Sequence, residues 1–341
     1  MKVATIQEPY KFTFSHAQTP EISDDEVLLK VNCLGICGSD MQIYKGLHKY
    51  MTLPVVPGHE FVATVVRQGK AVRGFQAGDR VTMDPKITCG HCWPCSIGRP
   101  NACESLKVMG VHAPGAACEY IVGKPRRMHK VPDRLSNDVA VLNEPLAVAV
   151  GSLNNCGQAL EDANVAIMGA GTIGNLTAQA AKAMGAKQVM LCDIDSRKLK
   201  MAAGSGVEHL VDLRETSLKE AIRARFGAHR QADILVDCSG AAPSFQAILD
   251  ASRGSSLIVI TGSFKAPVSF EIPRIQRRDI RIIGSHMYTE HDFAQALQLL
   301  EQGSIYVRNF ISAQFQFAEI DKAFEYTAEH PERVLKTMVV F

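Results

Sequence analysis

The amino-acid sequence predicts an α/β protein with a β-rich first part and a doubly wound parallel sheet in its second part. Up to about Pro132, β-rich runs alternate with turn residues. From Ala163 onward, short apolar strands alternate with helical patterns, which is the order typical of a parallel sheet covered on both faces. The chain has 341 residues, a length for which two domains are expected.

Local patterns locate the elements of each part. In the first part, we expect strands over residues 26–31, 61–66 and 80–83. Turn residues directly precede the strand at 80–83. In the second part, we expect strands over residues 165–168, 188–192, 234–237, 257–261 and 280–283. Helices are expected over residues 173–184, from Ser196 onward, and over 292–302 and 319–330, before a final strand over residues 336–341.

The charge balance argues against two classes of partner. The 37 basic and 35 acidic residues leave a formal net charge of +2, which gives no reason to expect nucleic acid or a membrane surface. The N-terminus reaches polar residues by Gln7 without the apolar core of a signal peptide, and the apolar runs are too short to cross a bilayer. We therefore expect a cytoplasmic protein.

The ten cysteines fall into two groups. In a reducing compartment a disulfide framework is not expected, so closely spaced cysteines indicate a metal site or catalysis. Five cysteines stand singly in apolar surroundings and are predicted to be small buried side chains: Cys33, Cys118, Cys156, Cys192 and Cys238. The remaining five are candidates for chemistry.

Four of these candidates lie within fifteen residues: Cys89, Cys92, Cys95 and Cys103. Glycines and prolines separate them, and such a loop can wrap four sulfurs around a tetrahedral zinc that has no open position. A closed site of this kind contributes to folding and does no chemistry. The alternatives are an iron–sulfur cluster or free thiols, but the spacing is not that of the ferredoxins. We expect a structural zinc.

A glycine-rich loop follows the strand predicted at residues 165–168 and leads into an alanine-rich helix. Its first glycine permits a tight turn, its second lets the backbone approach a pyrophosphate, and its third allows close helix–strand packing. This order predicts a dinucleotide site rather than the glycine-rich turn of some other α/β fold. The residues expected to bind the dinucleotide here are Gly169, Gly171, Thr172, Ile173 and Gly174.

An acidic residue at the end of the next predicted strand bears on the choice of cofactor. Asp193 lies nineteen residues after Gly174. A carboxylate there accepts hydrogen bonds from the adenosine ribose and repels a 2′-phosphate, which favours NAD over NADP. Arg197 and Lys198 follow closely and can also hold the ribose, so NADP remains the second choice.

The fifth candidate cysteine belongs to a possible second metal site. The residues concerned are Cys37 with Ser39 and Asp40, His59 with Glu60, and Glu144. Cysteine, histidine and glutamate are good zinc ligands, and a site with three protein ligands leaves one position for water or substrate. An open zinc lowers the pKa of an alcohol and favours hydride loss. Taken alone, each residue has a structural explanation: a histidine in a turn usually packs or faces solvent, and a glutamate before proline can simply precede a turn.

Together the motifs GICGSD, GHE, CGHCWPC with a fourth cysteine, EP and GAGTIG resemble the zinc-containing medium-chain alcohol dehydrogenase family, over essentially the whole chain. They are most similar to the branch of polyol, threonine and sugar-acid dehydrogenases, which has Glu-Pro where liver-type enzymes have a ligand cysteine. The resemblance implies a GroES-like catalytic domain, a Rossmann domain and a catalytic zinc in the cleft between them. The implied domains are residues 1–152 with 288–341, carrying a structural zinc lobe at 85–105, and residues 153–287.

The resemblance also implies roles for individual residues. It assigns the catalytic zinc to Cys37, His59 and either Glu60 or Glu144, each glutamate acting directly or through water. Ser39 corresponds to the hydroxyl that takes the proton of the substrate, and Asp40 to the carboxylate that orients the ligand histidine. We therefore expect two zinc ions per chain, one catalytic and one structural.

Two positions depart from the family pattern. Gln42 stands where many members have a histidine that passes the proton to solvent, so proton exit has to use water or another residue, for which His48 is one candidate. Ala63 stands where a glycine is usual, and we expect a strand to tolerate it.

The resemblance favours NAD-dependent oxidation of a secondary hydroxyl in a polyol or a sugar acid such as a hexonate. The alternatives are a threonine-type dehydrogenase, a zinc-free reductase similar to quinone oxidoreductases, and a non-catalytic NAD-binding protein. The full set of ligand residues argues against the last two. The resemblance also implies a homodimer or homotetramer, built partly through sheet edges. We expect a solvated or interface face, rather than a carboxylate clamp, from Arg274, Arg277, Arg278 and Arg281.

Overall fold

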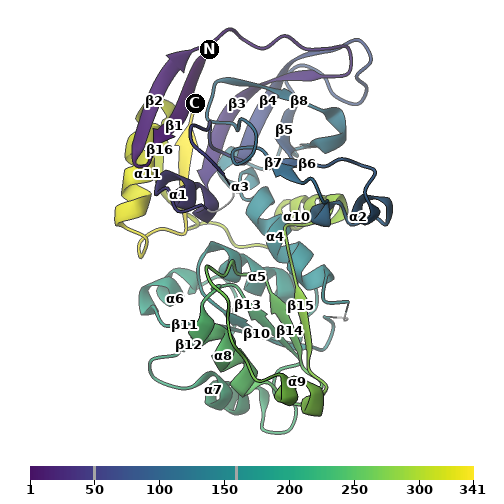
Figure 1. The fold of residues 1–341 in the computed structure, drawn as a ribbon, viewed down its shortest axis with the longest axis vertical. Helices are drawn as coiled ribbons and strands as arrows, with labels where there is room; N and C mark the ends of the chain where they lie inside the picture. The colour runs from purple at the N-terminus through teal and green to yellow at the C-terminus, as the bar shows by residue number, and fades with distance from the viewer. Residues whose placement is uncertain (49–50, 158–159) are drawn as a thin grey trace. The chain divides into compact units, whose positions relative to one another are not determined.

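A computed structural model describes residues 1–48, 51–157 and 160–341 (Figure 1). These divide into two units: Met1–Glu144 with Thr289–Glu301 and Asn309–Phe341, and Pro145–Tyr288 with Gln302–Arg308. The boundaries expected from the sequence lay near residues 152 and 288. The first observed boundary falls instead inside helix α4 (Asn143–Asn154), because one continuous helix carries the chain from the first unit into the second.

Strands dominate the first unit. They are β1 (Lys2–Glu8), β2 (Lys11–His16), β3 (Val27–Ile36), β4 (Glu60–Gln68), β5 (Arg80–Met83), β6 (Lys86–Ile87), β7 (Lys107–Val108), β8 (Tyr120–Gly123), β9 (Met128–Lys130), β16 (Ile311–Gln316) and β17 (Lys336–Val340). The main sheet has the order β16-β17-β3-β4-β5-β9, and β8 also pairs with β3. Its helices are α1 (Gly38–Tyr44), α2 (Trp93–Ser96), α3 (Asn137–Ala140), α10 (Glu290–Glu301) and α11 (Ile320–Glu329), with 3-10 turns η1 (Pro100–Ala102), η2 (Pro125–Arg127) and η3 (Phe317–Glu319).

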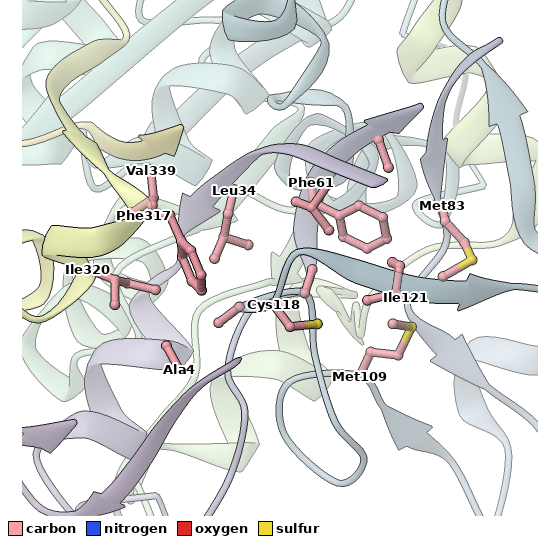
Figure 2. Close-up of a cluster of buried hydrophobic side chains, with 14 of the residues drawn as sticks. Ala4, Leu34, Phe61, Met83, Met109, Cys118, Ile121, Phe317, Ile320 and Val339 are labelled. Atoms are coloured by element: carbon pink, nitrogen blue, oxygen red, sulfur yellow. The ribbon is translucent and has the colours of Figure 1, made fainter. Parts of the chain in front are cut away.

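One apolar core joins segments from both ends of the chain in this unit. Figure 2 shows Leu34 of β3 and Phe61 of β4 in the same cluster as Ile320 and Val339, which come from α11 and β17. These side chains are almost completely buried. Full burial of such a side chain stabilises the fold by roughly 1.5–3 kcal/mol. The C-terminal segment therefore contributes directly to the core formed by β3 and β4.

The second unit is a parallel sheet with helical crossovers. Its strands are β10 (Asn164–Met168), β11 (Gln188–Asp193), β12 (His209–Asp212), β13 (Ile234–Asp237), β14 (Leu257–Ile260) and β15 (Arg281–Gly284). The helices that follow α4 are α5 (Thr172–Ala183), α6 (Ser196–Ala202), α7 (Leu218–Phe226), α8 (Ala242–Ala251) and α9 (Ile272–Arg278). The strand order β12-β11-β10-β13-β14-β15 reverses direction at β10, so right-handed crossovers place helices on both faces. The predicted doubly wound sheet is confirmed.

The strands expected at residues 26–31, 61–66 and 80–83 are confirmed as parts of β3, β4 and β5. The first part is β-rich, as predicted, but it also contains the short helices α1 and α2, which were not predicted; α1 follows β3 directly. The residue before α1 and the third residue of its first turn form a capping box, a local device that hydrophobic periodicity does not reveal. None of the described helices has the length and apolar character needed to cross a membrane.

Candidate metal centre and dinucleotide site

The end of β3 and the start of α1 fix the first candidate ligand. Cys37 is the residue that caps α1, and its backbone N–H donates to Asp40 Oδ2 at 2.9 Å. Asp40 is fully buried, and burial raises the pKa of its carboxyl group. A short helix that starts at the strand end thus holds the thiol, the carboxylate and the hydroxyl of Ser39 close together.

The start of β4 brings the second and third candidates beside the first. Glu60 pairs with Gly35 of β3, two residues before Cys37. One ligand atom from each of Cys37, His59 and Glu60 lies within 4.8 Å of the others. Sulfur, imidazole nitrogen and carboxylate oxygen at this spacing are a donor set that suits zinc, whose bonds to these atoms are about 2.0–2.3 Å long. Residues distant in sequence therefore form one group that fits the expected catalytic metal.

The imidazole of His59 is oriented by the residues around it. Its Nδ1 lies 3.6 Å from Asp40 Oδ1, and its Nε2 lies 3.5 Å from Ser39 Oγ. Burial acts to lower the pKa of His59, but the charges of Asp40 and Cys37 outweigh it and raise the pKa well above the ordinary value. The carboxylate faces Nδ1, which leaves Nε2 as the nitrogen for a metal, as expected when a second group fixes the tautomer.

Sequence reasoning missed a buried lysine at this centre. Lys336 Nζ lies 2.8 Å and 2.6 Å from the two carboxylate oxygens of Glu60 and donates to the carbonyl of Ile36 at 3.2 Å. Burial acts to lower the pKa of Lys336, but the charge of Glu60 outweighs it, and the pKa is raised. In the sequence, Lys336 is a charged residue at the start of an apolar strand. Such a residue usually lies at a strand end on the surface, so the sequence did not indicate a buried ion pair.

Glu144 lies outside the group of three ligand atoms. It is buried in the first turn of α4, so the alternative of a simple turn before Pro145 is wrong. Proline is tolerated there because the backbone N–H groups of the first turn have no acceptor within the helix. The charge of Glu144 nevertheless acts on both His59 and Lys336, raising their pKa values after the larger contributions. Glu144 is therefore near the centre, and Glu60 is the glutamate that lies among the ligands.

The four-cysteine loop forms a second cluster of sulfur atoms. All four Sγ atoms lie within 4.8 Å of one another, with 3.6 Å between Cys103 and Cys89 and 3.8 Å between Cys103 and Cys92. Sulfurs around a tetrahedral zinc at about 2.3 Å are separated by about 3.8 Å. Backbone hydrogen bonds from His91 and Cys92 lower the pKa of Cys89 to about 5, which favours the thiolate. The cluster fits the predicted structural zinc.

The glycine-rich loop leaves the carboxyl end of β10, where the strand order reverses. Gly169 has a φ of 100°, a conformation that suits glycine. A Cβ on Gly174 would collide with the carbonyl oxygen of Gly169, so helix α5 approaches the strand as closely as expected. Nothing lies within 4 Å of a Cβ at Gly171, which caps α5. Thr172 and Ile173 start the helix, whose N-terminal amides suit a pyrophosphate.

Asp193 ends β11 beside this loop. Its carboxylate accepts hydrogen bonds from the backbone N–H of Ala170 at 2.6 Å and of Asp195 at 2.8 Å. Asp195 caps α6 and forms an ion pair with Arg197 at 3.0 Å. Sequence reasoning missed Asp195, although it stands two residues after Asp193. Arg197 is thus engaged by a neighbouring carboxylate, and Lys198 lies half-buried in the same helix.

Most of the isolated cysteines are buried, as predicted. They are Cys33, Cys118, Cys156 and Cys192. Cys238 is half-buried and directly follows the carboxyl end of β13. Burial raises the pKa of Cys33 to about 12, so this thiol stays protonated and unreactive.

Local contacts hold several of the basic residues near α9. Arg274 pairs with Asp250 at 2.6 Å, and Arg277 lies 3.5 Å from Glu271. Arg278 donates to a backbone carbonyl at 3.1 Å. These contacts agree with the predicted solvated face rather than with a carboxylate clamp.

Two family models match the chain. The alcohol dehydrogenase GroES-like domain matches residues 23–133, and the zinc-binding dehydrogenase domain matches residues 172–302. An uncharacterized zinc-type alcohol dehydrogenase-like protein of Haemophilus influenzae is 34% identical, covering 100% of this chain and 99% of its own. L-threonine 3-dehydrogenase of Salmonella arizonae is 31% identical, covering 90% of each chain.

Two solved structures are similar over the whole chain. An alcohol dehydrogenase of Escherichia coli CFT073 in complex with NADH is 30% identical, with a TM-score of 0.92, covering 100% of this chain and 99% of that one. L-idonate 5-dehydrogenase of Escherichia coli is 25% identical, with a TM-score of 0.91, covering 100% and 98%. The two units therefore have the predicted GroES-like and Rossmann folds.

Proposed function

Because the chain belongs to the zinc-type medium-chain alcohol dehydrogenase family, we propose that it oxidises a secondary hydroxyl of a polyol or a sugar acid to a ketone, with zinc and NAD. The observation that carries the proposal is the group formed by Cys37, His59 and Glu60. The Glu-Pro motif at residues 144–145 and the similarity to L-idonate 5-dehydrogenase support the substrate class.

The residues around the metal group suit alcohol oxidation. A zinc ion bound by Cys37, His59 and Glu60 would lower the pKa of the substrate hydroxyl as a Lewis acid. Ser39 would take the proton of that hydroxyl, and its Oγ at 3.5 Å from His59 Nε2 supports this role. Asp40 keeps the imidazole in the tautomer that leaves Nε2 for the metal.

Proton exit needs a residue other than Gln42, because a glutamine side chain does not titrate. We propose His48, which is half-buried after α1. Burial lowers the pKa of His48, with a further lowering from His112 and an opposing contribution from Asp40.

NAD rather than NADP is the cofactor we propose. NAD would accept the hydride when bound, and Asp193 would accept hydrogen bonds from its adenosine ribose. Two carboxylates, those of Asp193 and Asp195, lie at and just after the end of β11 and would repel a 2′-phosphate bound there. Arg197, a candidate to neutralise a phosphate, is paired with Asp195.

An amino alcohol is the second candidate substrate. The 31% identity to L-threonine 3-dehydrogenase supports it, and threonine also carries a secondary hydroxyl.

We also propose a homodimer or homotetramer in which the edge strand β15 meets a second copy. The molecular mass in solution tests this, and a monomer at micromolar concentration would rule it out.

The first experiment measures zinc per chain together with NADH formation on polyols, aldonic acids and threonine. We expect close to two zinc ions and turnover on one substrate class. Cys37→Ser should retain only the structural zinc and lose turnover, while Cys103→Ser should lose the structural zinc together with thermal stability. One zinc in the unaltered protein and no turnover on any compound would contradict the proposed function.

A further inference from the structure

Three neighbouring strands bring Lys336 and Glu60 together across a glycine. β3 lies between β17 and β4 in the sheet, and Gly35 of β3 pairs with Glu60 on one side and Met338 on the other. Lys336 precedes Met338 by two residues, so the backbones of Lys336 and Glu60 lie more than two strand spacings, or more than about 9.6 Å, apart. A lysine and a glutamate side chain can close this distance only over a position without a side chain.

Gly35 provides that position. A Cβ on Gly35 would lie 2.5 Å from Glu60 Oε2 and 3.4 Å from Lys336 Cδ. The two charged side chains thus occupy the volume that a side chain at Gly35 would fill. Both are inaccessible to water: the side chains of Lys336 and Glu60 are 3% and 0% exposed. Their arrangement is determined by the backbone of three strands rather than by solvent.

The hold of Lys336 on Glu60 involves both carboxylate oxygens, at 2.8 Å and 2.6 Å from Nζ. One of these oxygens is also in the group with the Cys37 thiol and the His59 imidazole. Charge-assisted hydrogen bonds of this kind are among the strong ones, and a buried carboxylate needs a cationic partner. Glu60 therefore has two candidate partners, the ammonium group of Lys336 and the metal that we propose for the group.

We propose that Lys336 is a positioning residue that competes with the metal for the Glu60 carboxylate and so keeps this third ligand weakly bound and exchangeable. The inference rests on the catalytic metal proposed above and adds a function for a residue outside the ligand set. When Lys336 holds both oxygens, Glu60 gives little of its charge to the metal. When Lys336 is absent, the buried carboxylate has only the metal to pair with.

Lys336→Met removes the ammonium group and keeps an apolar chain of similar length. We expect zinc release from this site to a chelator to slow by at least tenfold. The gain in melting temperature on adding zinc to the metal-free protein should also increase, because only the metal-free variant leaves Glu60 unpaired. Zinc release from the two sites gives two kinetic phases. The phase that is missing in Cys37→Ser belongs to this site, and the remaining phase belongs to the four-cysteine loop.

Lys86→Met is the matched control. Lys86 is 4% exposed and pairs with Asp84 at 2.7 Å, so it is a second buried lysine on a carboxylate, but neither residue is in the metal group. Its loss should lower stability and leave zinc release within about twofold of the unaltered protein. Replacing zinc with cobalt gives a second readout: weaker visible absorption per cobalt in Lys336→Met would report an additional ligand.

Combining Lys336→Met with Glu60→Gln tests whether Lys336 acts on the metal through the Glu60 carboxylate. Glutamine carries no charge, so the slowing of zinc release should disappear in the double variant. Unchanged or faster release from Lys336→Met with an unchanged cobalt spectrum would overturn the inference and leave the catalytic metal in place. Only one metal per chain in the unaltered protein would overturn both.

Discussion

The carboxylate of Asp40 faces His59 Nδ1 at 3.6 Å with one oxygen and accepts the N–H of Cys37 at 2.9 Å with the other. Within the described residues, Asp40 Oδ1 and His59 Nδ1 have no hydrogen-bond partner, although both are buried. A small movement of either side chain would form a hydrogen bond between them. One carboxylate thus connects the start of α1 to the orientation of the imidazole.

Asp40→Asn should weaken the metal site with little effect on the helix. Asparagine still accepts the N–H of Cys37 but loses the charge that holds the imidazole. Loss of such a partner costs roughly 10–100-fold in metal affinity or activity. Zinc affinity and kcat measure it, with Asp138→Asn, an exposed acid in the first turn of α3, as the control. Unaltered zinc affinity would show that Asp40 only caps α1.

Gly35→Ala should disturb the centre through space rather than charge. The new Cβ would meet Glu60 Oε2 at 2.5 Å, so the carboxylate has to move. Overpacking of this kind costs about 1–3 kcal/mol, measurable by urea unfolding. In the control, Gly254→Ala, the Cβ would lie 3.6 Å from its nearest neighbour. Equal stability of the two variants would contradict the close contact.

Asp193→Ser should shift cofactor preference towards NADP. It removes the carboxylate that, in the proposed cofactor site, would repel a 2′-phosphate and leaves a hydroxyl that can donate to it. We expect the ratio of kcat/KM for NADP to that for NAD to rise about tenfold or more, a change of about 1.4 kcal/mol. Asp250→Ser, a change in the same unit on α8, provides the comparison. A constant ratio would show that Asp193 does not contribute to the cofactor site.

Glu26→Gln should alter the pH dependence of stability. The backbone N–H of Ser23, then its hydroxyl and Lys124, lower the pKa of Glu26 from 4.5 to about 2. A lowered folded-state pKa stabilises the protein above pH 4.5, and this contribution disappears as the pH falls towards 2. The variant should be less stable by about 1 kcal/mol at pH 7. The difference between the two proteins should close over that range in urea titrations, with Glu21→Gln as the comparison variant.

The parts of the fold with strong local patterns could be predicted from the sequence. The apolar strands of the parallel sheet and the loop at Gly169–Gly174 each follow from a run of adjacent residues. The four cysteines likewise specify their cluster by spacing alone, and the structure places their sulfurs within 4.8 Å. Local order in the chain was sufficient there because each feature is formed by one continuous segment.

The metal centre required information that no local segment contains. Lys336 is separated from Glu60 by 276 residues, and their contact depends on β17 pairing with β3 and β3 with β4. The choice between Glu60 and Glu144 likewise depended on sheet register, which places Glu60 opposite Gly35. Helix α1 was missed because seven residues are too few for a periodic pattern.

The position of β17 in the sheet has a consequence for synthesis of the chain. Residues Cys33–Ile36 of β3 pair with β17, whose residues leave the ribosome only after the second unit has been translated. Until then, one edge of β3 presents unpaired backbone groups, and exposed strand edges favour association between chains. The Cys33–Ile36 edge of the nascent first unit therefore stays unpaired until β17 has been synthesised. Slower translation or a lower growth temperature should alter the yield of folded protein.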